Sequence, residues 1–239
     1  LGSFVMRGAG CAYNDIADRD FDAKVQRTAL RPIPAGQISL RQAWVLLCIL
    51  SLIGLTVLLQ FNWTTVLLGI SSLALVAIYP FMKRITWWPQ AWLGLTFNWG
   101  ALMGFSSVTG EIAAPALLLY ASGIAWTLGY DTIYAHQDKE DDALIGVKSS
   151  ARRLAAKTKP TLTGFYAAAL VLAALSYLTG GGPPAGLLLF LAVAAHLRWQ
   201  IKALDIDDPR ACLTVFRSNR NAGLLMLAPF LLAAGLAQG

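Results

Sequence analysis

Long apolar runs separated by short polar segments dominate the chain. Each run has about the 17 to 25 residues that an α-helix needs to cross the hydrocarbon core of a bilayer. The runs cover residues 42–60, 64–82, 89–107, 112–133, 161–179, 183–201 and 221–237. This pattern predicts an all-α fold, a multi-pass transmembrane helical bundle.

A shorter apolar run opens the chain. Leu1 to Tyr13 is apolar apart from Arg7 and is too short to span a bilayer, and the chain begins with Leu rather than Met. We expect this run to be the end of a further helix, so that the chain holds about eight helices with the first incomplete. We also expect one transmembrane domain over residues 1–239.

The composition agrees with a membrane protein. Of the 239 residues, 56% are hydrophobic and 13% are charged, whereas about a quarter of the residues are charged in an ordinary soluble domain. Cys11, Cys48 and Cys212 lie far apart and show no C-x-x-C spacing. The cysteines therefore do not indicate a metal or redox site.

The charged residues fall on one side of the predicted membrane. If successive spans alternate in direction, every Lys and Arg except Arg7, and every Asp and Glu except Glu111, lies on the same side. By the positive-inside rule this side faces the cytoplasm, or the matrix in an organelle. The net charge of +6 thus reflects topology and attraction to the lipid bilayer. Nucleic-acid binding would need a soluble basic face or a binding module, and the sequence shows neither.

Acidic residues gather in two groups at predicted helix ends. Asn14, Asp18 and Asp22 stand at i, i+4 and i+8, so they share one face of a helix. Asp138 and Asp142 repeat the i, i+4 spacing. Each group can therefore offer two carboxylates to one point. The acids that we expect to point off these faces are Asp15, Asp20, Glu140 and Asp141.

Two other interpretations of the acidic groups are weaker. Charge runs are usually solvated loops, but two equally spaced pairs on one membrane face argue against that. Asp18, Asp20 and Asp22 match the first, third and fifth ligands of an EF-hand, yet Ala23 and Ala29 stand where that loop needs Gly and Glu. Paired carboxylates suit Mg²⁺, which keeps several waters and binds substrate phosphates.

Basic residues lie between and around the acidic groups in the sequence. Arg binds phosphate in a bidentate manner and Lys acts as a point charge. The candidates are Arg27, Arg31, Lys83, Arg84 and Lys148. Carboxylates, Mg²⁺ and these cations together predict a diphosphate site.

Several motifs resemble those of one family. Residues 14–36, with Asn14, Asp18 and Asp22 followed by RTALRPIPAG, closely resemble the first signature of the UbiA superfamily of intramembrane prenyltransferases. Residues 131–149, DTIYAHQDKEDDALIGVKS, are similar to its second signature. YPFMKR at 79–84 and FNWG at 97–100 resemble the branch that prenylates 4-hydroxybenzoate.

The resemblance implies a fold of nine transmembrane helices, of which this chain lacks the first. It implies Mg²⁺-dependent transfer of a polyprenyl group from polyprenyl diphosphate to the ring carbon ortho to the hydroxyl of 4-hydroxybenzoate, with release of diphosphate, in ubiquinone biosynthesis. The implied Mg²⁺ ligands are Asn14, Asp18, Asp22, Asp138 and Asp142, and the four aspartates are the implied catalytic residues. The implied diphosphate contacts are Arg27, Arg31, Tyr79, Lys83 and Lys148. Arg19 and Arg84 are placed near the acceptor.

Ionisation of a prenyl diphosphate leaves an allylic cation that needs a dry cavity with aromatic faces. The candidates to line it are Tyr79, Phe81, Phe97, Trp99, Trp126, Tyr130 and Tyr134. Trp and Tyr are also common at membrane interfaces for purely structural reasons.

Two alternatives stay open. A divalent-cation transporter would explain acidic residues in a membrane protein, although the complete apolar runs are nearly free of charge. The other alternative is a prenyltransferase of the same fold whose acceptor is a naphthoate, a porphyrin or a lipid.

We expect the protein to lie in the bacterial inner membrane, with the mitochondrial inner membrane as the alternative. We infer no obligate protein partner.

Overall fold

The computed structural model describes residues 1–23, 28–144, 146 and 148–236. It describes the backbone without the side chain for Phe21, Lys83, Asp141, Asp142, Leu144 and Leu236. Over these residues all regular structure is helical, which confirms the predicted all-α bundle. Residue contacts divide the chain into unit 1, Leu1–Pro80 with Ser106–Gly110, and unit 2, Phe81–Phe105 with Glu111–Gly239. The single domain remains a prediction.

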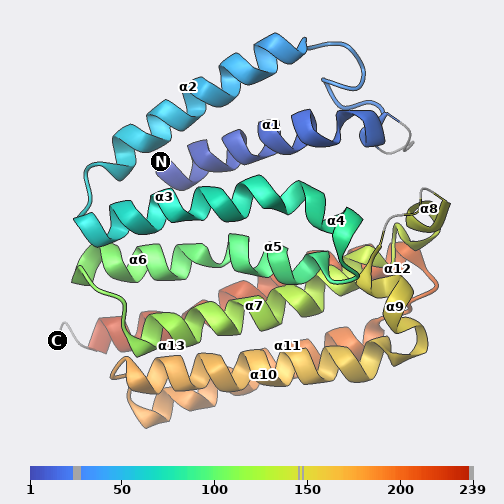
Figure 1. Ribbon diagram of the computed structural model, residues 1–239. Helices are drawn as coiled ribbons and strands as arrows, with labels where there is room; N and C mark the ends of the chain where they lie inside the picture. Colours follow the sequence, from blue (N-terminus) through green and yellow to red (C-terminus); the bar gives the residue numbers. More distant parts are fainter. Residues whose placement is uncertain (24–27, 145, 147, 237–239) are drawn as a thin grey trace. The chain divides into compact units, whose positions relative to one another are not determined.

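Unit 1 contains three long helices, α1 (Gly2–Asp22), α2 (Leu40–Leu58) and α3 (Trp63–Ile78). α1 and α2 lie side by side (Figure 1). The Ser39 hydroxyl accepts a hydrogen bond from Gln42 N, and Gln42 Oε1 accepts one from Ser39 N, so a capping box begins α2. Asn62 begins α3 by accepting a hydrogen bond from Thr65 N. The caps explain why these helices start where the polar segments end.

The outer faces of the helices fit a lipid environment. Among the described residues, four helical segments are long and apolar enough to cross a membrane: Leu40–Leu58, Trp63–Phe81, Ser150–Thr179 and Pro184–Ala203. Leu52 on α2 is 63% exposed, and many other large apolar side chains are exposed as well. Soluble proteins rarely expose contiguous apolar patches of this kind. The chain is an integral membrane protein.

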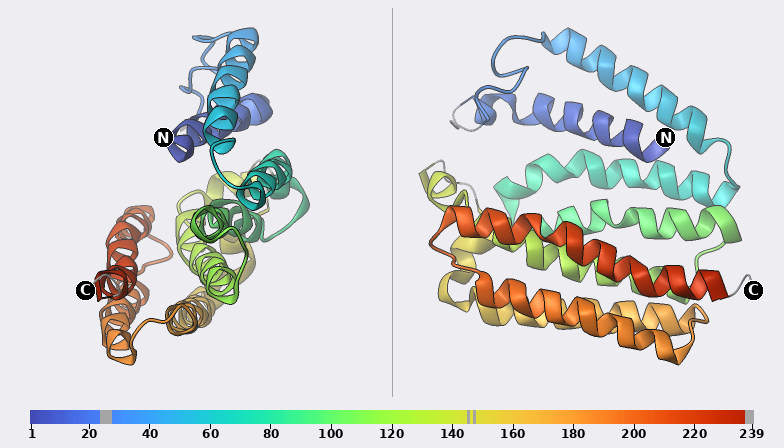
Figure 2. Two further views of the ribbon diagram at one scale, coloured as in Figure 1. Left: turned by 90° about the vertical axis from the view of Figure 1, so that its left-hand side faces the viewer. Right: turned by 180° about the vertical axis from the view of Figure 1, so that it is seen from behind.

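Unit 2 consists of long helices joined by short ones. The long helices are α6 (Trp99–Thr109, whose end belongs to unit 1), α7 (Ala114–Ala135), α10 (Thr158–Thr179), α11 (Phe190–Ala203, preceded by η3, Pro184–Leu189) and α13 (Asn219–Leu236). The short ones are α4 (Met82–Ile85, preceded by η1, Tyr79–Phe81), α5 (Pro89–Phe97), α8 (Lys139–Leu144), α9 (Ser150–Leu154), η2 (Ala155–Lys157) and α12 (Pro209–Arg217). In unit 2, α8, α9 and α12 gather at one end of the long helices (Figures 1 and 2).

The apolar run at 89–107 is interrupted at Asn98, between α5 and α6. Asn98 Nδ2 donates to Gly94 O at 2.8 Å and to Thr127 Oγ1 at 2.9 Å. Polar side chains that bond to backbone groups compete with the helix and bend it. A Cβ on Gly123 would lie 2.1 Å from Asn98 Oδ1, so glycine makes room for this side chain on α7.

The core of unit 2 lies between α7, α10, α11, α12 and α13. Its buried members are Ile133, Leu162, Tyr166, Val193, Leu197, Leu204, Cys212, Val215 and Ala222. This core fixes the end of α7, from which the second acidic group follows.

Candidate functional site

The first acidic group lies on α1, in unit 1. The helix continues to Asp22, so Asn14, Asp18 and Asp22 share one face, as the spacing predicts. All three side chains are partly buried. The helix therefore presents an amide and two carboxylates in a row.

Arg31 binds two carboxylates of this helix. Its Nη1 lies 2.8 Å from Asp22 Oδ2 and 2.9 Å from Asp15 Oδ1. The prediction that Asp15 points away from the acidic face is wrong, because Asp15 and Asp22 stand at i, i+7, nearly in line two turns apart, and share Arg31. Burial raises the pKa of Asp15 above its usual range, although the nearby Arg31 charge opposes that shift.

The other predicted contacts of unit 1 are placed as follows. Arg19 forms an exposed ion pair with Asp20, with Nε 3.2 Å from Oδ1. Tyr79 opens η1 at the end of α3. Arg27 lies outside the described residues. The diphosphate role of Arg31 and Tyr79 and the acceptor role of Arg19 stay predictions.

In unit 2, the predicted cations gather near α4. Lys148 Nζ donates to Ile85 O at 3.0 Å, which brings Lys148 to the helix that carries Lys83 and Arg84. The Arg84 guanidinium lies over the Phe81 ring, 5.5 Å from its centroid, as a cation–π contact. Only the backbone of Lys83 is described.

The second acidic group begins just beyond α7. The helix ends at Ala135, His136 caps it, and Asp138 directly precedes α8. Asp142 lies within α8, where its backbone alone is described. The i, i+4 spacing of Asp138 and Asp142 thus starts at the entrance of a short helix rather than within a long one.

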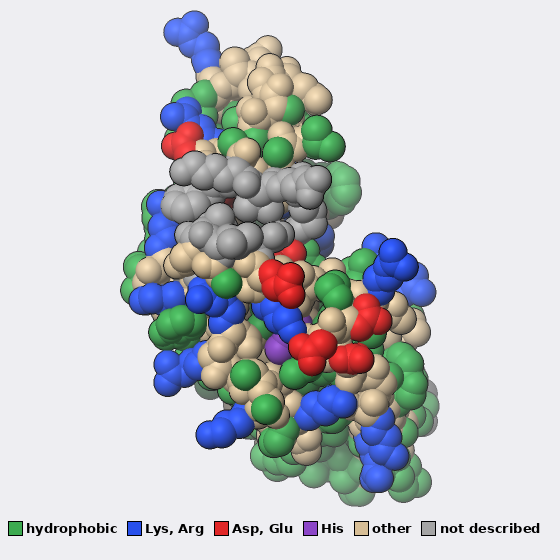
Figure 3. Space-filling model, turned by 90° about the vertical axis from the view of Figure 1, so that its right-hand side faces the viewer, with side chains coloured by type: hydrophobic (Ala, Val, Ile, Leu, Met, Phe, Trp, Pro, Cys, Tyr) green, Lys and Arg blue, Asp and Glu red, His purple; other side chains and the backbone are tan. Residues whose placement is uncertain are grey.

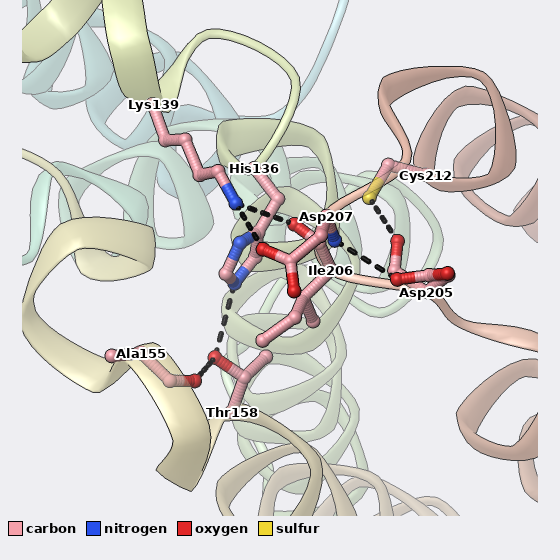
Figure 4. Close-up of polar contacts among 8 residues, drawn as sticks. All are labelled: His136, Lys139, Ala155, Thr158, Asp205, Ile206, Asp207 and Cys212. Carbon is pink, nitrogen blue, oxygen red and sulfur yellow. Dashed lines mark hydrogen bonds and ion pairs between the residues drawn. The ribbon is translucent and has the colours of Figure 1, made fainter.

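His136 is buried beneath this segment, with 2% of its surface exposed. Its Nε2 lies 3.0 Å from Thr158 Oγ1, and the Thr158 hydroxyl donates to Ala155 O at 2.7 Å (Figure 4). The Thr158 hydroxyl uses its proton for Ala155 O, so the imidazole of His136 donates from Nε2. Burial lowers the pKa of His136 to about 4, and the Lys139 charge acts in the same direction.

Charged side chains of both signs gather at the end of unit 2 that carries α8, α9 and α12 (Figure 3). Lys139 Nζ pairs with Asp207 Oδ1 at 2.6 Å. This pairing lowers the pKa of Asp207, chiefly through the hydrogen bond from Lys139. The residues of the second signature thus lie at a polar helix end.

The donor set on α1 fits Mg²⁺. Among the described residues no three His, Cys, Asp or Glu side chains form a group that could hold a metal ion alone. α1 instead offers two carboxylates and one amide oxygen, and Mg²⁺ usually takes one or two carboxylates besides water and substrate phosphates. Asn14, Asp18 and Asp22 are suited to such a shared site.

An aromatic cluster on α7 extends to a segment for which the sequence suggested no role. Trp126 and Tyr130 form an edge-to-face pair with centroids 5.7 Å apart, and Phe216 of α12 lies 5.9 Å from Tyr130 and 4.7 Å from Tyr134. Asn219 Oδ1 accepts a hydrogen bond from Trp126 Nε1 at 2.9 Å. No local spacing signals the contacts with Phe216 and Asn219, since these residues lie about ninety positions from their partners on α7.

The remaining predicted aromatics are dispersed. Trp99 forms an edge-to-face pair with Tyr120, with centroids 5.7 Å apart. Phe97 is 65% exposed and Phe81 is 41% exposed. A role of these rings in enclosing a cation stays a prediction.

Known proteins resemble this chain over nearly all of its length. Residues 1–233 match the model of the UbiA prenyltransferase family. Two curated relatives are named 4-hydroxybenzoate polyprenyltransferase, mitochondrial. That of Aedes aegypti is 48% identical over 235 residues, which cover 94% of this chain and 51% of the relative. That of Homo sapiens is 51% identical over 226 residues, which cover 94% of this chain and 61% of the relative. The chain thus spans between half and two thirds of their length.

Two solved structures share the fold. The apo structure of a UbiA homolog from Aeropyrum pernix K1 is 27% identical with a TM-score of 0.80, and the match covers 97% of this chain and 86% of that one. A UbiA homolog from Archaeoglobus fulgidus bound to GPP and Mg²⁺ is 17% identical with a TM-score of 0.67, and the match covers 95% and 83% of the two chains. With the family model matching almost every residue, the chain belongs to the UbiA prenyltransferase family.

Proposed function

We propose that the protein containing this chain transfers a polyprenyl group from polyprenyl diphosphate to the ring carbon ortho to the hydroxyl of 4-hydroxybenzoate, with Mg²⁺ as cofactor, in ubiquinone biosynthesis. The observation that carries the proposal is the row of Asn14, Asp18 and Asp22 on α1, in a chain about half identical to 4-hydroxybenzoate polyprenyltransferases. Such a row supplies the hard oxygen ligands that a Mg²⁺-diphosphate needs.

The side chains of this chain would divide the work as follows. The proposed metal ligands of unit 1 are Asn14, Asp18 and Asp22 on α1, and those of unit 2 are Asp138, just before α8, and Asp142, within it. Bound Mg²⁺ supplies electrostatic stabilisation of the charge that develops on the departing diphosphate. The candidates to bind the diphosphate oxygens are Arg27, Arg31, Tyr79, Lys83 and Lys148.

The pairing of Arg31 with Asp22 gives this arginine a second role, the neutralisation of carboxylate charge. It balances the charge of two neighbouring carboxylates, 2.8 and 2.9 Å away, on the face that would receive the metal. An arginine in this place can keep its contact with Asp15 and turn its remaining N–H donors to a phosphate, because the guanidinium carries five donors.

The apolar bundle would serve the second half of the reaction. After the carbon–oxygen bond breaks and diphosphate leaves, the allylic cation must be kept from water until the electron-rich ring attacks it. The attacked ring carbon then loses its proton, which restores the aromatic ring. Side chains such as Tyr130 and Tyr134, packed against Phe216, offer aromatic faces. Arg84 and Arg19 are the candidates to hold the acceptor carboxylate.

The fold alone does not select the acceptor, because one fold can host different functions. The choice of 4-hydroxybenzoate rests on the relatives of about 50% identity. An acceptor screen compares 4-hydroxybenzoate with naphthoate, porphyrin and lipid acceptors.

We further propose that the site faces the cytoplasm or the matrix, where the Lys and Arg residues gather. The bacterial inner membrane remains a prediction. The mitochondrial names of the relatives favour its alternative, the mitochondrial inner membrane. Locating the tagged protein by fractionation of its native cells distinguishes the two membranes.

The test is prenylation of radiolabelled 4-hydroxybenzoate by membranes that carry the protein at its full encoded length, with Mg²⁺ or with EDTA. We expect Mg²⁺-dependent product that falls by roughly a hundredfold or more in Asp18→Asn and Asp138→Asn, since oriented charge in an active site commonly contributes that much. Asp20→Asn and Glu140→Gln are matched controls, because both side chains are exposed. Absence of product from a folded protein would reject 4-hydroxybenzoate as the acceptor.

A further inference from the structure

Lys139 joins the second acidic segment to the connection between α11 and α12. Its Nζ donates to Ile206 O at 3.0 Å and pairs with Asp207 Oδ1 at 2.6 Å (Figure 4). Lys139 is the first residue of α8 and directly follows Asp138. The two partners lie 67 and 68 residues further along the chain. A single side chain thus connects the acidic segment to a distant element of unit 2.

The element that receives Lys139 is itself held in place. Asp205 Oδ1 accepts a hydrogen bond from Asp207 N at 3.0 Å, which is the local pattern of an Asx turn. Asp208 caps α12 by accepting a hydrogen bond from Arg210 N at 2.8 Å. Cys212 Sγ donates to Asp205 O at 3.1 Å, and Leu204 is 2% exposed. Lys139 is therefore attached to an ordered turn rather than to a free loop.

The other end of the segment is fixed as well. His136 lies two residues before Asp138, is buried, and bonds to Thr158 at the start of α10. The backbone between His136 and Lys139 thus has an attachment on each side of Asp138. Removal of the Lys139 attachment would loosen α8, which also contacts α9, and would leave the His136 attachment in place.

We infer that Lys139 is a positioning residue, whose bonds to Ile206 and Asp207 hold Asp138 and α8 in the orientation that binds Mg²⁺ and diphosphate. The inference rests on the proposed function, because it takes Asp138 and Asp142 as metal ligands. Lys139 acts through its neighbours, since its ammonium group is directed to Ile206 and Asp207. Groups that orient metal ligands commonly change metal affinity by about 10- to 100-fold.

The two bonds of Lys139 are expected to differ in strength. The Asp207 side chain is 79% exposed, so its ion pair with Lys139 is screened by solvent. The bond to Ile206 O is partly buried and has a charged donor, which makes it the stronger contact. Lys139→Met removes both bonds, whereas Asp207→Asn weakens one. Lys139→Arg keeps a charged donor of similar reach.

The test compares these variants for binding of a non-ionisable prenyl thiolodiphosphate in the presence of Mg²⁺, by titration calorimetry on the full-length protein in detergent. We expect about tenfold weaker binding for Lys139→Met, a loss of about two- to threefold for Asp207→Asn, and recovery toward the wild-type value in Lys139→Arg. Lys202→Met is the matched control, because Lys202 is exposed on α11 of the same unit. Its affinity should equal that of the wild type.

Amide hydrogen exchange separates positioning from general stability. In Lys139→Met we expect faster exchange over residues 137–144, with unchanged exchange in α10 and α11. Wild-type affinity in Lys139→Met, or faster exchange throughout unit 2, would overturn the positioning role. Neither measurement uses an acceptor, so failure to prenylate 4-hydroxybenzoate would count against the proposed function and leave the result for Lys139 standing.

Discussion

Arg31 Nη1 lies 2.8 Å from Asp22 Oδ2, and the same nitrogen also reaches Asp15. The Asp22 side chain is only 13% exposed, and that of Asp15 is 26% exposed. Loss of Arg31 would leave two partly buried carboxylates beside each other without this cation. Each would then carry an uncompensated cost of desolvation.

We therefore expect Arg31→Gln to lower the free energy of unfolding by about 1–2 kcal/mol in EDTA. This value is smaller than the cost of breaking a fully buried ion pair, because these side chains are partly exposed to solvent. Denaturation with SDS in mixed micelles measures this change. Arg19→Gln is the matched control, because the Arg19–Asp20 pair is largely exposed. The free energy of unfolding of Arg19→Gln should fall by less than about 0.5 kcal/mol. Equal losses in the two variants would contradict a structural role for the Arg31 contacts.

Local patterns in the sequence were sufficient for most of the long helices and for the face of α1. Asn14, Asp18 and Asp22 follow from helical spacing alone, and α1 confirms the shared face. The i, i+7 relation of Asp15 to Asp22 was also available in the sequence. That Asp15 and Asp22 share one cation depends on Arg31, however. The turn that returns Arg31 to α1 is not specified by local periodicity.

Contacts between distant residues could not be predicted in this way. The interruption at Asn98 depends on Thr127, on another helix. The bond of Lys139 depends on the backbone of Ile206, whose carbonyl carries no sequence signature. Both are set by how helices pack, and the pattern of one sequence does not report packing partners.

Gly129 of α7 faces the ring of Tyr166 on α10. A Cβ at Gly129 would lie 2.3 Å from Tyr166 Cε1, and that tyrosine is 2% exposed. Gly129→Ala should therefore lower the free energy of unfolding by about 1–3 kcal/mol, because a packed ring must move. Gly164 on α10 has nothing within 4 Å of the equivalent position.

The matched variant Gly164→Ala should be neutral or stabilising by up to about 1 kcal/mol, since alanine favours the helix. The same SDS titration compares the two alanines. A loss in Gly164→Ala as large as that in Gly129→Ala would indicate a general intolerance of α7 and α10 to alanine, in place of the specific contact with Tyr166.

Ala155, between α9 and α10, has φ 44° and ψ −120°. Residues with a side chain rarely adopt this conformation, and it costs about 1–3 kcal/mol. Ala155→Gly should raise the free energy of unfolding by roughly 1 kcal/mol, after the greater entropy of glycine in the unfolded chain is subtracted. Ala156→Gly is the control, because Ala156 lacks a positive φ, and it should destabilise. Thermal unfolding in detergent provides both values, and destabilisation by Ala155→Gly would refute strain at this position.

His136 gives the stability a defined pH dependence. Its pKa is about 4 in the folded protein, against 6.5 in a model peptide, because burial and the Lys139 charge disfavour the imidazolium, with Asp207 opposing them. Between pH 6.5 and pH 4 the unfolded chain binds a proton that the folded protein excludes, so stability falls as the pH falls through this window. Above pH 6.5 both states are neutral at this position, and the effect vanishes.

We expect the wild type to lose on the order of 1 kcal/mol more than His136→Gln between pH 7 and pH 5, measured by SDS titration in EDTA. Gln keeps a donor for Thr158 and does not titrate. Asp207 does not interfere, because its lowered pKa lies below this range. Identical pH profiles for the two proteins would mean that His136 takes up a proton in the folded state as readily as in the unfolded state. In that case Lys139 and the buried surroundings do not keep the imidazole neutral.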